Sequence, residues 1–250
     1  MVIFSHKSRH GRLTALAGLA AFTGAALVPL APASAGSLSA TPTSLALAAP
    51  AATAKLTVSG KGEGQTAGQV RVLRWIQQDG AERLVPTRDV VASPPALRLD
   101  PGKELTVRLV RTTKKPVSGE ECYRVMVDQL PGAEQDGLAV KFALRHSIPL
   151  CFDGAKQKQG AIGWSLRREG GKLVLTGTNS GQRRVVASDL KILGPKGAPL
   201  ALGPATVLGG SSMSWPIERA PAGLKPGARF TISATINGKT VEFDGKVGGS

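Results

Sequence analysis

The sequence predicts an all-β protein made of two β-sandwich domains in tandem. Three observations support this fold class. Short apolar runs that alternate with polar residues recur from residue 45 to residue 243, and Gly and Pro turn signals separate them. No long run has the apolar period of an amphipathic helix. The polar segment from Asp153 to Gly160 predicts a linker between two sets of strands.

Residues 1–35 have the layout of a secretory signal. A short basic stretch precedes an apolar run, Leu13–Leu30, and a small-residue cleavage site, Ala33–Ala35, follows. A retained membrane anchor is the alternative, but Pro29 interrupts the end of the apolar run and Pro32 follows it closely. We therefore expect an exported protein that begins near Gly36, located in the periplasm of a host with two membranes.

The composition is strongly basic. The leader carries three of the 32 Lys and Arg residues and none of the 17 Asp and Glu residues, so the exported chain keeps a net charge of +12. The cations are scattered, and aromatic residues make up only 4% of the chain, which argues against a surface that stacks bases. We expect no nucleic-acid partner and interpret the charge as a solvated surface that resists self-association.

The residues of common catalytic sites are scarce. His146 is the only histidine after the leader, so a multi-histidine metal site is excluded and a Ser-His-Asp triad is possible only through this residue. The sequence contains no G-x-S-x-G elbow, no phosphate-binding loop motif and no zinc-type cysteine spacing. We expect no catalytic residue, no metal, no cofactor and no small-molecule substrate.

The first set of strand-like runs ends near residue 152. About seven strands in this length are typical of one immunoglobulin-like sandwich. The first five runs are Leu45–Leu47, Leu56–Val58, Val70–Ile76, Leu97–Leu99 and Leu105–Val110.

The last two runs of this set, Cys122–Pro131 and Leu138–Phe152, predict an antiparallel hairpin around a loop near Asp136. Paired positions of a hairpin have a constant index sum, and Cys122 and Cys151 share the centre of this loop. They should lie on neighbouring strands within disulfide reach. In an exported chain this pattern predicts one structural disulfide, and a metal pair or two free thiols are the alternatives.

A second set of strand-like runs follows the linker. Its members are Gly163–Arg167, Lys172–Thr176, Val185–Ala187, Leu190–Leu193, Phe230–Ile236 and Thr240–Phe243. The expected organisation is therefore a leader at 1–35, a first domain at 36–152, a linker at 153–160 and a second domain at 161–250.

Three segments of the first domain resemble the PapD-like periplasmic chaperones of chaperone-usher pili. They are Val91–Leu109, with its proline pair and Asp-Pro-Gly turn, Glu120–Pro131 and Leu138–Phe152. The second domain fits in length and strand count and in details such as Thr176–Ser180. The Tyr-Arg start of one hairpin strand and the Ile-Pro end of the other are most similar to the archaic, spore-coat-like branch. The resemblance implies two immunoglobulin-like sandwiches in a boomerang arrangement.

The resemblance implies a chaperone that captures, folds and stabilises pilin or fimbrial subunits and delivers them to an outer-membrane usher. Such proteins lend an edge strand with alternating apolar side chains to the open groove of the subunit. The residues with this spacing are Leu138, Val140, Phe142 and Leu144. The alternative is an ordinary strand whose apolar face lies in its own core. Self-association of the protein without a bound subunit is a further expected interaction.

The resemblance also implies a basic cleft that binds the C-terminal carboxylate of the subunit. The family's cleft lysine aligns with Pro149, and its first-strand arginine has no counterpart in Thr41–Leu45. Arginine can replace a lysine as a carboxylate ligand. The candidate anchors are Arg108, Arg111, Arg124 and Arg145. The resemblance further pairs Arg108 with Glu120 in an ionic network near the domain junction.

Two other classes of function are alternatives. In a secreted two-domain structural or adhesive protein, the apolar stripe at 138–144 would be buried, and no partner would co-purify. A hydrolase on a sandwich scaffold would have to rely on the single histidine of the exported chain.

Overall fold

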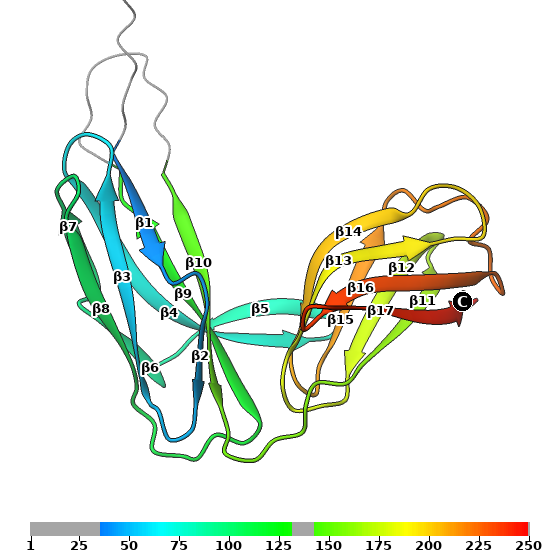
Figure 1. Cartoon of the computed structure of the whole chain (residues 1–250), viewed down its shortest axis with the longest axis horizontal. Coiled ribbons are helices and arrows are strands. Elements are labelled where there is room, and N and C mark those ends of the chain that lie inside the picture. Colours follow the sequence, from blue (N-terminus) through cyan, green and yellow to red (C-terminus); the bar gives the residue numbers. More distant parts are fainter. Residues whose placement is uncertain (1–35, 132–142, 250) are drawn as a thin grey trace, which may run out of the picture. The chain divides into compact units, whose positions relative to one another are not determined.

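The computed structural model of the protein describes residues 36–131 and 143–249 (Figure 1). The first ten strands are β1 (Ser37–Thr41), β2 (Leu45–Ala48), β3 (Thr53–Lys61), β4 (Thr66–Gln78), β5 (Ala81–Pro86), β6 (Val90–Ser93), β7 (Ala96–Leu99), β8 (Glu104–Arg111), β9 (Glu120–Gln129) and β10 (Arg145–Asp153). The others are β11 (Ile162–Glu169), β12 (Lys172–Asn179), β13 (Val185–Leu193), β14 (Leu200–Val207), β15 (Ser212–Ile217), β16 (Arg229–Ile236) and β17 (Lys239–Lys246). None of these described residues forms a helix of the length and apolarity that crossing a membrane requires.

The first domain is a sandwich of two sheets. One sheet has the order β1-β3-β8-β6, and the other has the order β2-β10-β9-β4-β5, with β7 also paired to β4. Alternating residues of facing strands fill the core between them, among them Leu56, Leu109, Val125 and Leu150, each with no exposed surface. The alternation that predicted these strands therefore reflects one buried and one outward face. The expected immunoglobulin-like sandwich is confirmed.

The predicted hairpin register is confirmed. β9 and β10 pair antiparallel from Arg145 opposite Asp128 to Asp153 opposite Glu120, and Cys122 lies directly opposite Cys151. The disulfide between these two cysteines is present. Three members of the predicted lending strand, Leu138, Val140 and Phe142, lie outside the described residues.

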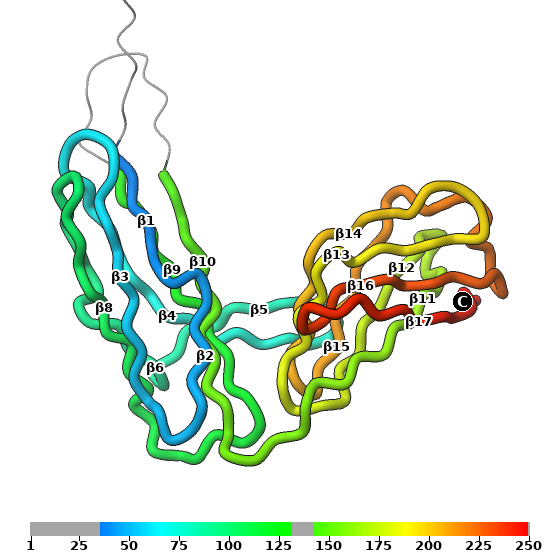
Figure 2. Tube along the Cα trace, in the orientation of Figure 1, coloured from blue at the N-terminus to red at the C-terminus, as the bar shows by residue number. Residues whose placement is uncertain are grey.

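The two neighbours of β10 differ in how much of it they cover. β9 pairs with all of it, whereas β2 pairs in parallel only with Leu150–Asp153 (Figure 2). Within the described part of the chain, the stretch Arg145–Pro149 therefore has no strand on its other side. This stretch is a free sheet edge, and its position matters because an open edge can accept a further strand.

The second domain is also a two-sheet sandwich. Its sheets have the orders β11-β12-β15 and β14-β13-β16-β17. Leu166, Leu175, Ile192 and Ile232 are among the residues that fill its core. The predicted runs Val185–Ala187 and Leu190–Leu193 are one strand, β13, which contains a bulge where Asp189 has a positive φ of 51°.

Several strands lacked a clear sequence signal. β14 contains Gly203 and Pro204, and β15 contains Pro216, so both runs resemble turn segments in the sequence. Both are edge strands of their sheets, where a proline need not donate to a ladder. The short strands β1, β5 and β6 are edges as well, and weak alternation is tolerated at an edge because only one side pairs.

Candidate functional site

The candidate site lies on the outer face of the sheet that contains β10. On β9, Tyr123, Val125 and Val127 point into the core, so the residues between them point outward. The outward residue Arg124 lies opposite Pro149 of β10 on one side and Leu73 of β4 on the other. Arg124 is thus the direct cross-strand neighbour of the position where the family resemblance expects a lysine.

The Arg124 side chain reaches across β4 toward β5. Its guanidinium carbon lies 3.8 Å from the centre of the Trp75 ring, a cation–π distance. Its Nη2 lies 3.9 Å from Oε2 of Glu82 on β5. Its Nε is buried and has no hydrogen-bond partner among the described residues. Burial lowers the pKa of Arg124 and the Glu82 carboxylate opposes this shift, but an arginine stays protonated at any physiological pH.

A second charged group lies further along the same face. The Asp128 carboxylate accepts hydrogen bonds from Arg71, at 3.0 Å from Nε and 2.6 Å from Nη2, and pairs with Arg145 on β10. Burial disfavours the ionised carboxyl, but the hydrogen bonds from Arg71 and Arg145 outweigh it, so the pKa of Asp128 lies below its usual value. The two arginines thus bracket one carboxylate and leave a net positive charge.

The depressed pKa of Asp128 gives a testable pH dependence. Because the folded-state pKa is lower than the unfolded one, the ionised carboxylate stabilises the fold above about pH 4, and this stability is lost as the pH falls through the folded pKa. We expect the stability gap between the unmodified protein and Asp128→Asn, measured by urea unfolding, to be constant near neutral pH and to narrow on acidification. A gap that does not change with pH would contradict this assignment.

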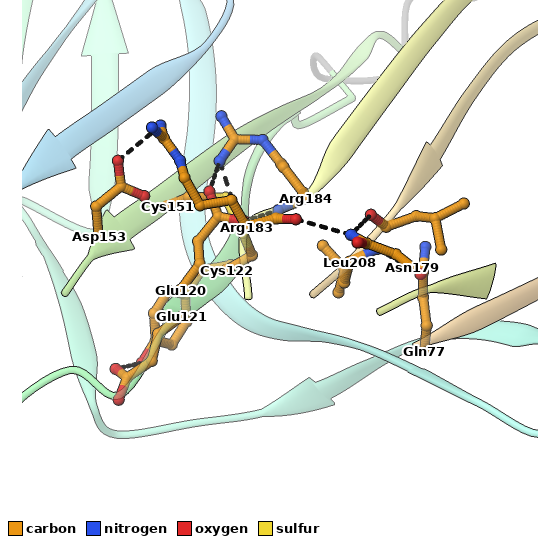
Figure 3. Close-up of a disulfide and its surroundings, with 12 residues drawn as sticks. Gln77, Glu120, Glu121, Cys122, Cys151, Asp153, Asn179, Arg183, Arg184 and Leu208 are labelled. Carbon is orange, nitrogen blue, oxygen red and sulfur yellow. Dashed lines mark hydrogen bonds and ion pairs between the residues drawn. A yellow bond between two sulfur atoms is a disulfide. The ribbon is translucent and has the colours of Figure 1, made fainter. Parts of the chain in front are cut away.

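The disulfide lies on the same face as Arg124, two residues earlier on β9. A residue of the second domain covers it. Cys122 and Cys151 are buried in one cluster with Trp75 and with Leu208, which follows β14. Figure 3 shows the two cysteines and Leu208. The side chain of Gln77 holds this contact in place, since it donates to Thr206 O and accepts from Leu208 N, each at 2.8 Å. The two sandwiches belong to one compact unit, and the hydrogen bonds of the Gln77 amide are one of the contacts that connect them.

Two ion pairs form another contact between the sandwiches. Glu120 pairs with the guanidinium of Arg184 and accepts from its backbone N at 2.7 Å, and Asp153 pairs with Arg183 at 2.9 Å (Figure 3). The Glu120 side chain is only 1% exposed. Burial raises the pKa of Glu120, and the bonds from Arg184 counteract this effect. The charge of Glu120 is therefore tolerated because Arg184 is held against it.

The predicted pairing of Arg108 with Glu120 is wrong. Arg108 lies on β8 in the other sheet, where its neighbours Val107 and Leu109 point into the core and its own side chain is exposed. It forms no ion pair among the described residues. Arg184 pairs with Glu120 instead. It lies 64 residues further along the chain, directly before β13, which places it at the contact between the two sandwiches.

Arg111, another candidate anchor, is committed to contacts inside its own domain. Its guanidinium binds both carboxylate oxygens of Glu121, at 3.1 and 3.2 Å, and the carbonyls of Thr113 and Lys115, each at 2.8 Å. Its side chain is 7% exposed. Of the four candidates, only Arg124 and Arg145 therefore lie on the outer face beside β10.

One cluster of potential metal ligands occurs among the described residues. It consists of Glu120, Cys122 and Cys151. Both sulfurs belong to the disulfide, and a metal binds a thiolate rather than a disulfide sulfur. This cluster is therefore not a metal site in the oxidised protein.

Comparisons with known proteins identify the first domain. Residues 37–156 match the family model of the pili and flagellar-assembly chaperones, PapD N-terminal domain. The first domain belongs to this family. No curated protein matches the sequence at a significant level.

Solved structures extend the likeness to both domains. A chain of the CsuC–CsuE complex of chaperone and tip adhesion subunit, from the archaic chaperone-usher Csu pili of Acinetobacter baumannii, aligns with a TM-score of 0.65 at 21% identity, over 86% of this chain and 99% of that one. A chain of the SafA pilin–SafB chaperone complex of Salmonella enterica gives 0.59 at 18%, over 84% and 96%. The E. coli chaperone DraB gives 0.57 at 21%, over 84% and 98%. At these identities the likeness establishes the fold, two sandwiches in tandem.

The N-terminal end of β10 in the PapD-type domain lies between the core residues of this strand and the predicted lending stripe. Ile148, Leu150 and Phe152 are buried in the domain's own core. Leu144 has the same parity, so its side chain falls on the same face of the strand, yet it is 46% exposed. Apolar residues on this face of the strand therefore continue beyond the domain's own core, on the N-terminal side of Ile148.

Sequence reasoning missed several residues of this PapD-type domain's outer face and of the junction. They are Arg71, Trp75, Gln77, Glu82, Arg183 and Arg184. The adjacent pair Arg183-Arg184 just before a strand was a visible signal, because two neighbouring cations next to a strand need counterions. The roles of Trp75 and Glu82 depend on strand order and had no local signal.

Proposed function

We propose that this protein is a periplasmic chaperone that captures pilin or fimbrial subunits by lending them a strand and passes them to an outer-membrane usher. The observation that carries the proposal is the free edge of β10 in a domain of the PapD family. The complexes of chaperones with a tip adhesion subunit and with a pilin, which share the fold, support the same partner class. The mechanism requires neither a cofactor nor a catalytic residue.

The backbone at the free edge is suited to accept a strand. Gln129 N donates to Leu144 O at 2.9 Å, so residue 144 and the other even-numbered residues of β10 bond toward β9. The N–H and C=O groups of Arg145 and Ser147 consequently point away from β9. Pro149, at the next outward position, has no N–H to leave unpaired where β2 begins to cover the strand.

The side chains for the lending role lie on the N-terminal side of this edge. Leu138, Val140, Phe142 and Leu144 continue the even parity of Ile148 and Leu150, and we propose that they enter the open groove of a subunit. The exposure of Leu144 supports this reading over a strand fully packed in its own core. A subunit that lacks one strand would gain both the apolar contacts and the missing backbone hydrogen bonds.

We assign the carboxylate anchor to Arg124. It lies opposite Pro149 in a pair that is not hydrogen-bonded, the kind in which cross-strand side chains come closest. Its cation is partly desolvated, which strengthens a charge-assisted hydrogen bond to a carboxylate. Arg145 also lies on this face, but Asp128 already neutralises part of its charge.

The lending strand can be tested by co-purification with a candidate pilin from the same locus. We expect a one-to-one complex with the unmodified protein and none with Val140→Asp, Phe142→Asp, because buried aspartates in the groove lack partners. The matched control, Ala139→Asp, Ala143→Asp, adds the same two charges on the opposite face and should retain most binding.

Two results would contradict the proposal. If the Val140, Phe142 variant folds and binds as well as the unmodified protein, another strand is lent. If this variant fails to fold while the Ala139, Ala143 control folds, the apolar side chains belong to the protein's own core, and the structural or adhesive class gains support. Circular dichroism of each variant separates loss of folding from loss of binding.

A further inference from the structure

Arg124 is directed away from the edge at which a subunit would bind. Its backbone lies on β9 beside β10, but its guanidinium extends over Trp75 of β4 toward Glu82 of β5. In the order of the sheet, β4 and β5 lie on the opposite side of β9 from β10. The same cation can therefore be used on either side of β9, and in the protein without a subunit it is used on the β5 side.

The contact with Glu82 is weak enough to be exchanged. The two charged groups are 3.9 Å apart, no hydrogen bond joins them, and the Glu82 side chain is 40% exposed. Glu82 lies on an edge strand, and Arg124 is its only ion-pair partner among the described residues. A solvated ion pair of this kind shifts an equilibrium by about fivefold or less.

Trp75 holds the Arg124 side chain in the position that it has without a subunit. Its ring is buried, and Arg124 stacks on it at 3.8 Å. Stacking on the ring orients the plane of the guanidinium, so that its terminal N–H groups face Glu82 in the protein without a subunit. The buried Nε of Arg124, without a partner among the described residues, is a donor that Glu82 does not satisfy.

We propose that Glu82 is an internal placeholder for the C-terminal carboxylate of the subunit, and that an incoming carboxylate displaces it from Arg124. The inference rests on the anchor role of Arg124 proposed above. In the free protein the placeholder keeps a half-buried cation paired. It also lowers the net gain on capture, because one ion pair is broken when another is made, and this favours later release of the subunit.

A short synthetic peptide of alternating threonine and valine tests this exchange. It is acetylated at its N-terminus and prepared in two forms, one with a free C-terminal carboxylate and one with an amide. Binding of each form to the full protein is measured by calorimetry. We expect Glu82→Gln to bind the free acid about two- to fivefold more tightly than the unmodified protein does and to bind the amide equally well.

The matched control is Asp79→Asn on the same hairpin. Asp79 pairs with Arg83 at 3.9 Å, so the control removes the same charge from β4–β5 without touching Arg124. Asn also tolerates the positive φ of 55° at this turn position. This variant should bind both peptides as the unmodified protein does. Equal tightening by both variants would show a general charge effect and would overturn the placeholder, as would weaker binding of the free acid by Glu82→Gln.

An Arg124→Gln variant separates failure of the placeholder from failure of the anchor. If Arg124→Gln loses the preference for acid over amide while Glu82→Gln changes nothing, Arg124 is the anchor and the placeholder is wrong. If Arg124→Gln keeps the preference, the anchor itself is wrong. Absence of free-acid binding in both the unmodified protein and Glu82→Gln would contradict both assignments.

Discussion

Replacing Arg111 with methionine is expected to destabilise the protein by about 3–5 kcal/mol, the usual consequence of removing one partner of a buried ion pair. Arg111 is almost fully buried at the end of β8, and its guanidinium holds both oxygens of Glu121 together with the carbonyls of Thr113 and Lys115. Methionine keeps much of the volume but none of the donors. The Glu121 carboxylate would then be buried without its counterion.

The remaining partners of Glu121 cannot replace Arg111. Tyr123 donates its hydroxyl to Glu121 at 3.2 Å, and burial raises the pKa of Tyr123 to about 12, so this group is a neutral donor. Arg74 lies next in the network, but it binds the Tyr123 hydroxyl and Asp89 rather than Glu121. The carbonyls of the segment that joins β8 to β9 would also lose their donors.

The measurement is urea unfolding of Arg111→Met beside two further variants. Arg108→Met, three residues earlier on β8, removes an exposed arginine and should change stability by less than about 0.5 kcal/mol. The double variant Arg111→Met, Glu121→Gln should recover part of the loss, because no charge is left unpaired. A loss below about 1 kcal/mol for Arg111→Met would mean that water or another cation satisfies Glu121.

The alternation of the sequence predicted those parts of the fold where one face of a strand is buried. β8 and β16 alternate because their sheets have a core on one side, whereas β9 is largely buried on both faces. The hairpin register followed from the index sum of Cys122 and Cys151. β14 and β15 were missed because Gly203, Pro204 and Pro216 resemble turn residues. Pairing with β13 and β12 holds these edge strands, and such partners are set by the tertiary fold.

The candidate site was predictable only in part for the same reason. Arg124 could be proposed because it lies within the motif-bearing hairpin. Its partners could not, since Trp75 and Glu82 come from two other strands and meet it only through the order of the sheet. The ion-pair partner of Glu120 was predicted wrongly. The family resemblance implied Arg108, and no local feature of the sequence indicated that Glu120 contacts Arg184.

Removal of the disulfide is expected to have the second large effect. Cys122→Ser, Cys151→Ser should lower stability by about 3–4 kcal/mol, the chain-entropy value for the loop that this bond closes. Cys151 has no exposed surface and Cys122 has little, so two serine hydroxyls in the cluster with Trp75 and Leu208 would add to the loss. A double alanine variant separates this added term from the loss of the cross-link.

The position of the disulfide predicts a functional loss as well. Cys151 lies where β2 begins to cover β10, directly after the free edge Arg145–Pro149. A covalent bond to β9 at this point holds the register of the strand when no subunit pairs with its open side, and a slip of one residue would turn the apolar face outward. We therefore expect both cysteine variants to capture less subunit at growth temperature, even when unfolding is incomplete.

This hypothesis is tested by comparing capture with stability over a range of temperatures. The unmodified protein, the double serine variant and the double alanine variant are incubated with the same pilin-like subunit, and the bound fraction is compared with the folded fraction from circular dichroism. If capture falls only as much as the folded fraction, the bond serves stability alone. If either variant captures subunits normally at growth temperature, the disulfide does not hold the lending hairpin in register, and the pairing of β9 with β10 must suffice.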